Sequence, residues 1–568
     1  MKNKLLSSVL LMLALTISAC SSNKSSNVPQ QSVEPNSSES SSSEEEDPPI
    51  IDNSGFKNIN DEEPFDIHTS VQKAFLEYDG NYTKMPTTAY PDGTAHLSDS
   101  LPITLTWTYE LPEGKELAKY SVIYGQEKDL SDGYRVDKTD IDVDNISFNN
   151  PYLGKNYYQL IATFTDGSTD ETPIRRLFVD STYPRNLTIE GMTNCRDIGG
   201  RELEDGGKIK QGLIFRTSGK NQNGSLTAVT TEEMINHLRV KNEINLAGDS
   251  NSYNLNLEGT KLYEGSRMDT SSTGGYSHIS RNTEAIKNFF TFIADENNYP
   301  LYYHCKIGTD RTGVCTILLQ GLLGVSYQQT YQDYLFSNFG KIGEQRAIGD
   351  GSSHDIRKYM DDFLSYSGER FQNKVYNILL GLGLREETLD HIIDNLVEGD
   401  KPKGNDANQV IATGDDLICI DATRKERADL RDNPEVYYLL ESESQHVEYD
   451  FEAKEDFTGQ VVAYLANPDL NQTDSTNKNK KIADAINVEL DYDYQTLIDQ
   501  NFYEARLGIC KGSSITTRIN YWPVILCTVE ITKGGHTITI DGGNYNMNIA
   551  GIYIFDNATA GGQNGFEE

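Results

Sequence analysis

Apolar and polar positions alternate through much of the N-terminal third of the chain. From residue 63 to residue 181, apolar residues recur at every second position, as at Tyr120, Val122 and Tyr124, and turn-rich segments separate these runs. Period-two alternation between turns is typical of β-strands that bury one face. We therefore predict a β-sandwich over residues 63–181.

The middle of the chain follows another pattern. Phe289 and Ile293 have helical spacing, residues 301–303 form a short apolar run typical of a strand, and residues 314–323 form an apolar run typical of a buried helix. Further helices are predicted over residues 327–337, 356–363 and 385–397. Short strands mixed with helices predict an α/β domain over residues 185–401.

A second alternating region ends the chain. Residues 402–414 are polar and contain Gly, Asn and Asp, which is typical of a linker. Alternation then returns, as at Val447, Tyr449 and Phe451, so we predict a second sandwich over residues 415–568. The expected fold class is therefore multidomain, with a central α/β domain between two all-β sandwiches.

The N-terminal residues have the pattern of an export signal. Lys2 and Lys4 precede an apolar run too short to span a membrane, and small residues stand before Cys20. Residues 1–20 thus resemble the signal peptide of bacterial lipoproteins, in which the cysteine is acylated. The resemblance implies lipidation at Cys20 and an extracytoplasmic, membrane-anchored protein at the cell surface. Residues 21–62, rich in Ser and Glu, are predicted to be a disordered tether.

Charge limits the partners. The chain has 86 acidic and 50 basic residues, a formal net charge of −36. Such an excess repels polyanions, so we expect no nucleic acid partner. A site for a phosphorylated ligand must therefore be locally positive.

The candidate chemistry lies directly after the predicted strand at residues 301–303. The stretch reads, in order, His304, Cys305, Lys306, Ile307, Gly308, Thr309, Asp310, Arg311, Thr312 and Gly313. A loop that joins a strand to a helix aims several backbone N–H groups at one point, beside the positive end of the helix dipole. That point suits a phosphate dianion, and the same field favours a thiolate.

The residue types in this loop predict a division of roles. Cys305 is the candidate nucleophile, because a thiolate can attack phosphorus in line with the leaving oxygen. Arg311 can donate two parallel hydrogen bonds to the phosphate oxygens. Thr312 can donate to the sulfur, and His304 can fix the loop from behind. This chemistry needs no metal and no other cofactor.

The spacing of Cys305 and Arg311, Cys-x5-Arg, resembles the signature of the protein tyrosine phosphatase superfamily. Residues 194–200, 214–219 and 333–338 resemble further motifs of its bacterial tyrosine phosphatase family, and the likeness covers about residues 186–398. The supporting residues that these motifs imply are Asn194, Arg196, Asp197 and Arg216.

The resemblance implies hydrolysis of phosphate monoesters, of a phosphorylated protein or a small molecule, through a cysteinyl-phosphate intermediate. Phosphotyrosine is the first substrate that it suggests, and inositol phosphates or phosphoinositides are the alternative. In this family the residue at Asp310 is the proposed general acid. The wider superfamily uses an upstream loop aspartate instead, for which Asp269 is the candidate; we favour Asp310.

Some positions depart from the family pattern. Thr309 stands where relatives often have Lys, which weakens the case for polyphosphorylated substrates, although Lys306 lies nearby. Glu243 begins a strand where relatives tend to show Asp-Leu-Arg, so a supporting ion pair could be missing. Cys195 replaces an aromatic residue, and a reversible disulfide of Cys305 with Cys195 or Cys315 is a further hypothesis.

The outer domains also resemble known modules. The first resembles a fibronectin type III module, without a site of its own. The second resembles the jelly-roll carbohydrate-binding modules of secreted enzymes, with Tyr521, Trp522 and Tyr545 as candidates to stack on a sugar ring. A glycan is therefore a candidate partner. The rival to an enzyme is a glycan-binding surface protein whose central phosphatase-like domain is inactive.

Overall fold

The computed structural model describes most of the chain beyond residue 50. The described ranges are residues 51–82, 98–248, 251–268, 282–343, 345–347, 355–357, 360, 364–403, 408–426, 436–468, 479–505, 507–510 and 518–556. The signal peptide with Cys20, most of the tether and Asp269 lie outside these ranges. Within them, no helix is both long and apolar enough to cross a bilayer.

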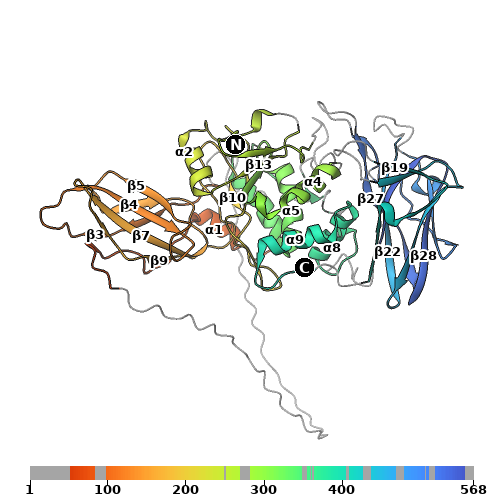
Figure 1. Ribbon diagram of the computed structural model, residues 1–568, viewed down its shortest axis with the longest axis horizontal. Coiled ribbons are helices and arrows are strands. Elements are labelled where there is room, and N and C mark those ends of the chain that lie inside the picture. The colour runs from red at the N-terminus through yellow and green to blue at the C-terminus, as the bar shows by residue number, and fades with distance from the viewer. Residues whose placement is uncertain are drawn as a thin grey trace, which may run out of the picture. The chain divides into compact units, whose positions relative to one another are not determined.

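Strands dominate the N-terminal domain (Figure 1). Its main sheet has the order β5-β4-β7-β8, with β9 also paired to β7. These strands are β4 (Leu117–Gly125), β5 (Tyr134–Lys138), β7 (Gly154–Phe164), β8 (Thr169–Glu171) and β9 (Arg175–Val179). The smaller pairs are β1 (Phe56–Lys57) with β3 (Thr108–Tyr109), and β2 (Ile103–Thr106) with β6 (Asn145–Phe148). Tyr120, Val122 and Tyr124 of β4 are at most 2% exposed, which confirms the strand that the alternation predicted.

Two features of this domain correct the sequence-based boundaries. The tether predicted over residues 21–62 is too long, because β1 lies within it and Phe56 packs against Trp107 in the domain core. The region predicted to be all β also contains α1 (Ser70–Leu76), capped by Thr69. Phe75 of α1 packs edge-on against Phe339 of the central domain, so this helix joins the two domains.

The central domain is built around a mostly parallel sheet of order β10-β12-β15-β13-β14. Its strands are β10 (Arg196–Asp197), β12 (Ile214–Thr217), β13 (Asn242–Asn245), β14 (Lys261–Tyr263) and β15 (Leu301–His304), and only β10 is antiparallel to its neighbour. A separate pair joins β11 (Lys208–Ile209) to β16 (Val397–Glu398). Because β15 is the middle strand, its C-terminal end opens at the centre of the sheet edge.

Helices surround this sheet. They are α2 (Ala228–Thr231), the π-helix η3 (Glu232–His237), α4 (Thr283–Ile293), α5 (Asp310–Leu322), α6 (Tyr327–Phe336), α8 (Phe371–Gly381) and α9 (Glu386–Leu396). The helices predicted at residues 314–323, 327–337 and 385–397 are confirmed as α5, α6 and α9. The helix predicted at residues 356–363 falls largely outside the described residues. Almost every side chain of α5 is buried, as expected for a helix without a polar face.

The C-terminal domain is a sandwich of two sheets around one apolar core. The first sheet has the order β19-β20-β29-β22-β27, with β17 also on β29, and the second has the order β18-β21-β28-β23-β24. The first contains β17 (Gln409–Thr413), β19 (Thr423–Glu426), β20 (Val436–Leu440), β22 (Phe457–Ala466), β27 (Trp522–Ile531) and β29 (Met547–Asp556). The second contains β18 (Ile418–Ile420), β21 (His446–Ala453), β23 (Ile486–Leu490), β24 (Asp493–Tyr494) and β28 (Gly534–Gly542). A short pair joins β25 (Gly508–Cys510) to β26 (Arg518–Asn520).

Two expectations for this domain are wrong. The linker predicted over residues 402–414 is too long, because β17 already belongs to the sandwich. Tyr521 and Trp522 are 0% and 5% exposed, so neither can stack on a sugar. The backbone carbonyl of Tyr521 instead accepts a hydrogen bond from Thr283 Oγ1 at 2.9 Å, which ties the sandwich to α4 of the central domain.

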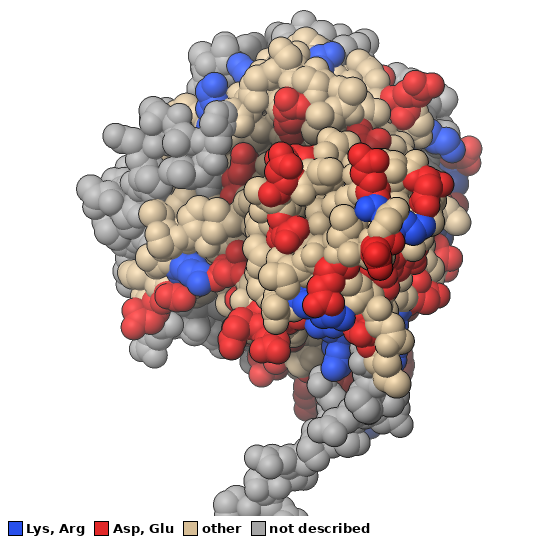
Figure 2. Space-filling model, turned by 90° about the vertical axis from the view of Figure 1, so that its left-hand side faces the viewer, with Lys and Arg blue, Asp and Glu red and all other residues tan. Residues whose placement is uncertain are grey.

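The acidic character of the sequence is visible at the surface. On the face shown in Figure 2, acidic side chains are widely scattered and basic side chains are fewer. A polyanion would meet net repulsion there. This face therefore offers no extended positive surface to a phosphorylated ligand.

Candidate active site

The cysteine loop, residues 304–313, runs from the end of β15 into the first turn of α5. Gly308 adopts a φ of 72°, a conformation that favours glycine. A Cβ atom there would lie 2.5 Å from the carbonyl oxygen of Thr217 at the end of β12. Gly219 N donates to the carbonyl of Lys306 at 3.0 Å and holds the loop from the same side. The neighbouring strand thus fixes the loop's shape.

Cys305 lies at the base of this loop and is 2% exposed. Burial raises the pKa of its thiol, but the charge of Arg311 and hydrogen bonding from Thr312 outweigh burial and hold the pKa below its ordinary value. Arg311 is itself buried in the first turn of α5. A thiolate is thus stabilised close to a cation that can also hold a phosphate.

His304 is fixed by a partner that the sequence did not suggest. Its Nε2 atom lies 2.9 Å from Glu243 Oε1, and its Nδ1 atom lies 2.9 Å from the carbonyl oxygen of Cys305. Burial raises the pKa of Glu243, but His304 more than offsets this and holds that pKa below its ordinary value. Glu243 therefore fixes the orientation of His304 from the neighbouring strand β13, where the sequence suggested that a supporting partner is absent.

The back of the loop is held by two residues from the flanking motifs. Asn194 Nδ2 donates to the carbonyl of Gly308 at 3.0 Å and to Thr309 Oγ1 at 3.2 Å. An Arg216 N–H donates to the same Gly308 carbonyl at 2.6 Å. Asn194 has a φ of 60°, which asparagine tolerates better than most residues. Both side chains therefore position the loop and do not face the phosphate.

Asp333 of α6 joins these supports. It accepts from Arg216 at 2.7 Å and from Arg196 at 3.0 Å, and Tyr183 donates its hydroxyl to it at 2.5 Å. Burial raises the pKa of Asp333, but the two arginines outweigh burial and hold it well below its ordinary value. Arg196 acts on the loop only through Asp333 and Asn194, to whose side-chain oxygen it also donates. Tyr183 lies in no motif, and only the folded chain brings it here.

Asp197 belongs to a different cluster. It pairs with Arg185 at 2.8 Å and accepts from the backbone N–H groups of Gly199 and Gly212 at 2.8 and 2.7 Å. Burial is the largest influence and raises the pKa of Asp197 despite Arg185. These contacts shape the turn after β10, and β12 lies between β10 and β15 in the sheet.

Asp310, the candidate general acid, forms an ion pair at the start of α5. Arg346 donates to both of its carboxylate oxygens, at 2.8 and 3.0 Å. The backbone of Arg346 is fixed in turn by the side chain of Asn338, which accepts from Arg346 N at 2.7 Å and donates to its carbonyl at 2.9 Å. The pair stabilises ionised Asp310. Asn338 lies in a family motif, but Arg346 gave no sequence signal.

The remaining residues of the cysteine loop differ in how far their side chains are exposed to solvent. Lys306 is exposed, with its ammonium 5.9 Å from the ring centre of Tyr253, and Ile307 is half-buried. Thr309 and Thr312 are fully buried. Gly313 donates its N–H to the carbonyl of Thr309 at 2.7 Å. Lys306 is thus the loop's exposed cation, above the buried Arg311.

Cys195 and Cys315 are free and buried, and burial raises the pKa of each thiol. They are therefore protonated near neutral pH and poorly reactive. The disulfide between either one and Cys305 stays a prediction. The described residues contain no group of three or more His, Cys, Asp or Glu side chains placed to hold a metal.

Comparison with known proteins agrees with this geometry. Residues 187–398 match the tyrosine phosphatase family. The matched segment contains the cysteine loop, β10, β12, α6 and Asp333 with its partners Arg196 and Arg216, but not Tyr183. The match supports a phosphatase domain, and hence a hydrolase, in the middle of the chain. No curated protein matches the chain.

Several solved structures are similar to part of the chain. A GH26-CBM35 β-(1,4)-mannanase from Podospora anserina is 13% identical with a TM-score of 0.19, over 26% of this chain and 27% of that one. A family 35 carbohydrate binding module from Clostridium thermocellum is 13% identical with a TM-score of 0.17, over 26% of this chain and 97% of that one. The CBM36-1 domain of a multidomain xylanase from the hindgut metagenome of Trinervitermes trinervoides is 12% identical with a TM-score of 0.17, over the same shares. This chain thus spans under a third of the mannanase.

Proposed function

We propose that the protein is a surface-anchored phosphatase that hydrolyses phosphate monoesters, phosphotyrosine first, through a cysteinyl-phosphate intermediate. One observation carries the proposal: the buried thiol of Cys305, with its pKa lowered by Arg311, lies at the N-terminus of α5 inside a loop closed by Gly308. A thiolate, a guanidinium and a helix N-terminus at one point suit a phosphoryl group that is being transferred.

The first step forms a bond between sulfur and phosphorus. The Cys305 thiolate attacks phosphorus while the bond to the ester oxygen breaks, and protonated Asp310 gives its proton to that leaving oxygen. Arg311 binds the equatorial oxygens, where charge is redistributed in the transition state. In the second step water attacks phosphorus, ionised Asp310 takes a proton from the water, and the sulfur leaves as thiolate. The products are the alcohol or phenol and inorganic phosphate.

The ion pair of Asp310 with Arg346 must open or weaken for the first step, because an ionised carboxylate cannot donate a proton. A substrate phosphate can weaken this ion pair, because its negative charge competes with Asp310 for the guanidinium of Arg346. Arg346 would then add a second cation beside Arg311 when the phosphate binds. Binding and protonation of the acid are thereby linked.

The environment of Thr309 supports a monoester with a single phosphate. Its side chain is buried and accepts a hydrogen bond from Asn194 at 3.2 Å. Position 309 therefore carries no positive charge, and its side chain instead helps to hold the loop through a neutral hydrogen bond. Without a lysine at position 309 the loop carries less positive charge than in many relatives, which favours phosphotyrosine over inositol phosphates and phosphoinositides.

Purified wild type and Cys305→Ser compared on p-nitrophenyl phosphate test the proposal. We expect turnover by wild type and none by the variant, because a hydroxyl at this position is not ionised near neutral pH. Cys419→Ser makes the same change in the C-terminal domain and should leave turnover intact. Phosphotyrosine peptides, phosphoserine peptides and inositol phosphates then rank the substrates. Equal turnover by wild type and Cys305→Ser would reject the mechanism.

The anchoring is a separate proposal supported by the sequence around Cys20. In a bacterial host fed an alkyne-bearing fatty acid, we expect the full chain to be labelled and recovered with membranes. Cys20→Ser should lose both the label and the membrane association. An unlabelled wild-type chain would reject the lipid anchor, but it would not contradict the proposed phosphatase activity.

A second candidate function is glycan binding by the C-terminal sandwich. Tyr494 in the edge strand β24 and Tyr492 just before it are 73% and 78% exposed, so their rings are available to stack on a sugar. Tyr545 is less suited, since Lys480 covers its ring at 3.9 Å. Affinity electrophoresis in gels that contain plant or bacterial polysaccharides tests this function. The function is supported if a polysaccharide retards the wild type and Tyr503→Ala but not Tyr492→Ala or Tyr494→Ala. It is rejected if no polysaccharide retards the wild type.

A further inference from the structure

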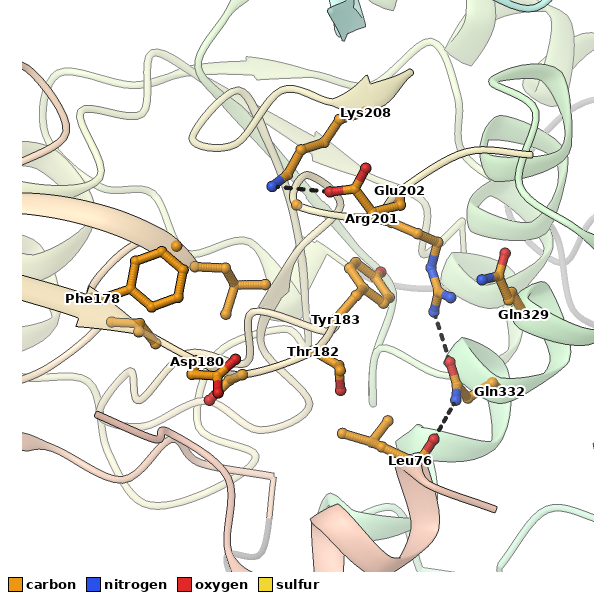
Figure 3. A pocket seen from close by; sticks show the side chains of 15 residues that line it. Leu76, Phe178, Asp180, Thr182, Tyr183, Arg201, Glu202, Lys208, Gln329 and Gln332 are labelled. Atoms are coloured by element: carbon orange, nitrogen blue, oxygen red, sulfur yellow. Dashed lines mark hydrogen bonds and ion pairs between the residues drawn. The ribbon is translucent and has the colours of Figure 1, made fainter. Parts of the chain in front are cut away.

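A pocket of about 450 Å³ lies where the N-terminal and central domains meet (Figure 3). Leu76 of α1 and Leu153 and Phe178 of the β-rich domain are among the residues that line it. Arg201 lines it next to Gln332 of α6, and Leu76 lies on the other side of Gln332 from Arg201. No residue of the cysteine loop lines it. The volume is within the range of small-molecule sites, which is about 300–1,000 Å³.

The charge of Arg201 is poorly compensated at this pocket. Its side chain is only 4% exposed, and its guanidinium lies 4.0 Å from the ring centre of Tyr183. One N–H donates to Gln332 Oε1 at 3.0 Å, but Nε has no hydrogen-bond partner within the described part of the chain. Gln332 is neutral and is itself tied to the carbonyl of Leu76 and the hydroxyl of Tyr82. Arg201 is thus a buried cation held by neutral groups.

The buried charges around Arg201 do not balance. Asp333, the nearby carboxylate that favours the charged form of Arg201, is already shared by Arg196 and Arg216. Among the described residues no carboxylate forms an ion pair with Arg201. Burial accordingly lowers the pKa of Arg201. A buried unpaired charge is costly, and an anion that enters the pocket would relieve that cost.

The acidic groups of the pocket lie at its rim. Glu202 is 73% exposed and pairs with Lys208 at 3.3 Å, and Asp180 is exposed as well. Solvent and salt screen these charges more than they screen Arg201. A ligand with one negative charge gains from Arg201 at little cost, whereas a phosphate dianion would be repelled twice as strongly by the rim. Leu76, Leu153 and Phe178 offer apolar surface in the same pocket as the cation.

We propose that this pocket binds a small organic carboxylate. The carboxylate pairs with Arg201, and the apolar body of the ligand packs against Leu76, Leu153 and Phe178. Because both domains contribute to the pocket, the ligand also strengthens their contact. The pocket shares Tyr183 with the network around Asp333, but no residue of the cysteine loop lines it.

Isothermal titration calorimetry on the full chain carrying Cys305→Ser tests this site without turnover. The probes are benzoate, hexanoate and 3-phenylpropanoate, each compared with its neutral amide at constant ionic strength. We expect at least one acid to bind at least tenfold more tightly than its amide. Arg201→Gln should abolish that preference. Arg176→Gln removes an arginine of β9 that does not line the pocket, so it should leave the preference unchanged.

A second variant covers the case in which Arg201→Gln does not fold. Thr182 is exposed at the pocket (Figure 3), so Thr182→Trp should block the pocket and abolish binding while Arg201 stays in place. The proposal is overturned if none of the three acids binds, or if acids and amides bind equally well. It is also overturned if binding persists unchanged in both Arg201→Gln and Thr182→Trp. None of these results bears on the hydrolysis of p-nitrophenyl phosphate by the wild type.

Discussion

Arg346 donates to both carboxylate oxygens of Asp310, at 2.8 and 3.0 Å, an ion pair that favours the charged form of this candidate general acid. The negative charge of Asp310 in turn raises the pKa of Cys305 and partly opposes the effect of Arg311. The ion pair therefore has two effects on the reaction. It disfavours proton donation by Asp310, and it shields the thiolate from the carboxylate.

The first prediction follows from these two effects. In Arg346→Gln the proton stays on Asp310 to higher pH, and the thiolate of Cys305 forms only at higher pH. Both limbs of the pH–rate profile for kcat/KM should therefore move to higher pH, by about one unit. Steady-state rates on p-nitrophenyl phosphate between pH 4 and pH 9 measure this shift. Arg346→Lys keeps the charge and should shift the profile less; an unshifted profile in Arg346→Gln would contradict the role of the pair.

The second prediction concerns Asp333. Asp333→Asn leaves Arg196 and Arg216 buried without their carboxylate, which typically costs about 3–5 kcal/mol of stability. Urea unfolding followed by far-UV circular dichroism, which reports the helices of the central domain, measures the loss. The matched control is Asp394→Asn, which breaks an exposed pair with Lys401 and should cost under about 1 kcal/mol. Equal losses in the two variants would show that the buried network contributes little.

The same residue gives a third prediction, on pH. The pKa of Asp333 is lower in the folded chain than its ordinary value, so the unfolded chain binds the proton more readily. Its contribution to stability is therefore complete above the ordinary aspartate pKa near 4 and is lost as the pH falls below that value. Wild type and Asp333→Asn should consequently differ most at neutral pH, and the difference should begin to shrink as the pH falls from 4 to 3. A difference that stays constant from pH 7 to pH 3 would contradict this account.

Much of the site could be predicted from sequence because its parts are local. The cysteine loop, the end of β15 and the start of α5 are consecutive in the chain, and Asn194, Arg196 and Arg216 stand in short motifs. Glu243, Arg346 and Tyr183 were missed as partners because their contacts are long-range. Tyr183 meets Asp333 across 150 positions, and a lone tyrosine outside a periodic pattern gives no signal of such a contact.

The limits of the fold prediction also have physical causes. The helix of α5 was predicted to begin at residue 314 but begins at Asp310, because its polar first turn faces the phosphate site and breaks the apolar pattern. The helix α8 was missed because it buries polar residues such as Asn373 and Lys374 along with apolar ones, which removes the helical period. Lys374 Nζ there donates to the carbonyl of Tyr366 at 2.9 Å. Tertiary contacts thus satisfy residues that a sequence pattern assigns to the surface.

The fourth prediction tests the link between Tyr183 and the cysteine loop. Tyr183→Phe removes the hydroxyl that donates to Asp333 and leaves the ring under Arg201. We expect a loss of about 1 kcal/mol in stability and a several-fold fall in kcat, because Asp333 positions Arg216 against Gly308. Tyr553→Phe is the control, since the buried Tyr553 hydroxyl has no hydrogen-bond partner among the described residues. A fall in stability without any change in kcat would limit Tyr183 to a structural role.

The fifth prediction separates conformational strain from steric contact at Gly308. Gly308 and Gly114 have nearly equal φ angles, 72° and 76°, but a Cβ at Gly114 meets nothing within 4 Å, whereas at Gly308 it meets Thr217 O at 2.5 Å. Gly114→Ala should therefore cost only about 1 kcal/mol of stability and no activity. Gly308→Ala must displace the loop from β12 and should lower kcat/KM about 100-fold. If both variants kept full activity on p-nitrophenyl phosphate, the close contact between loop and strand would not be what positions Cys305.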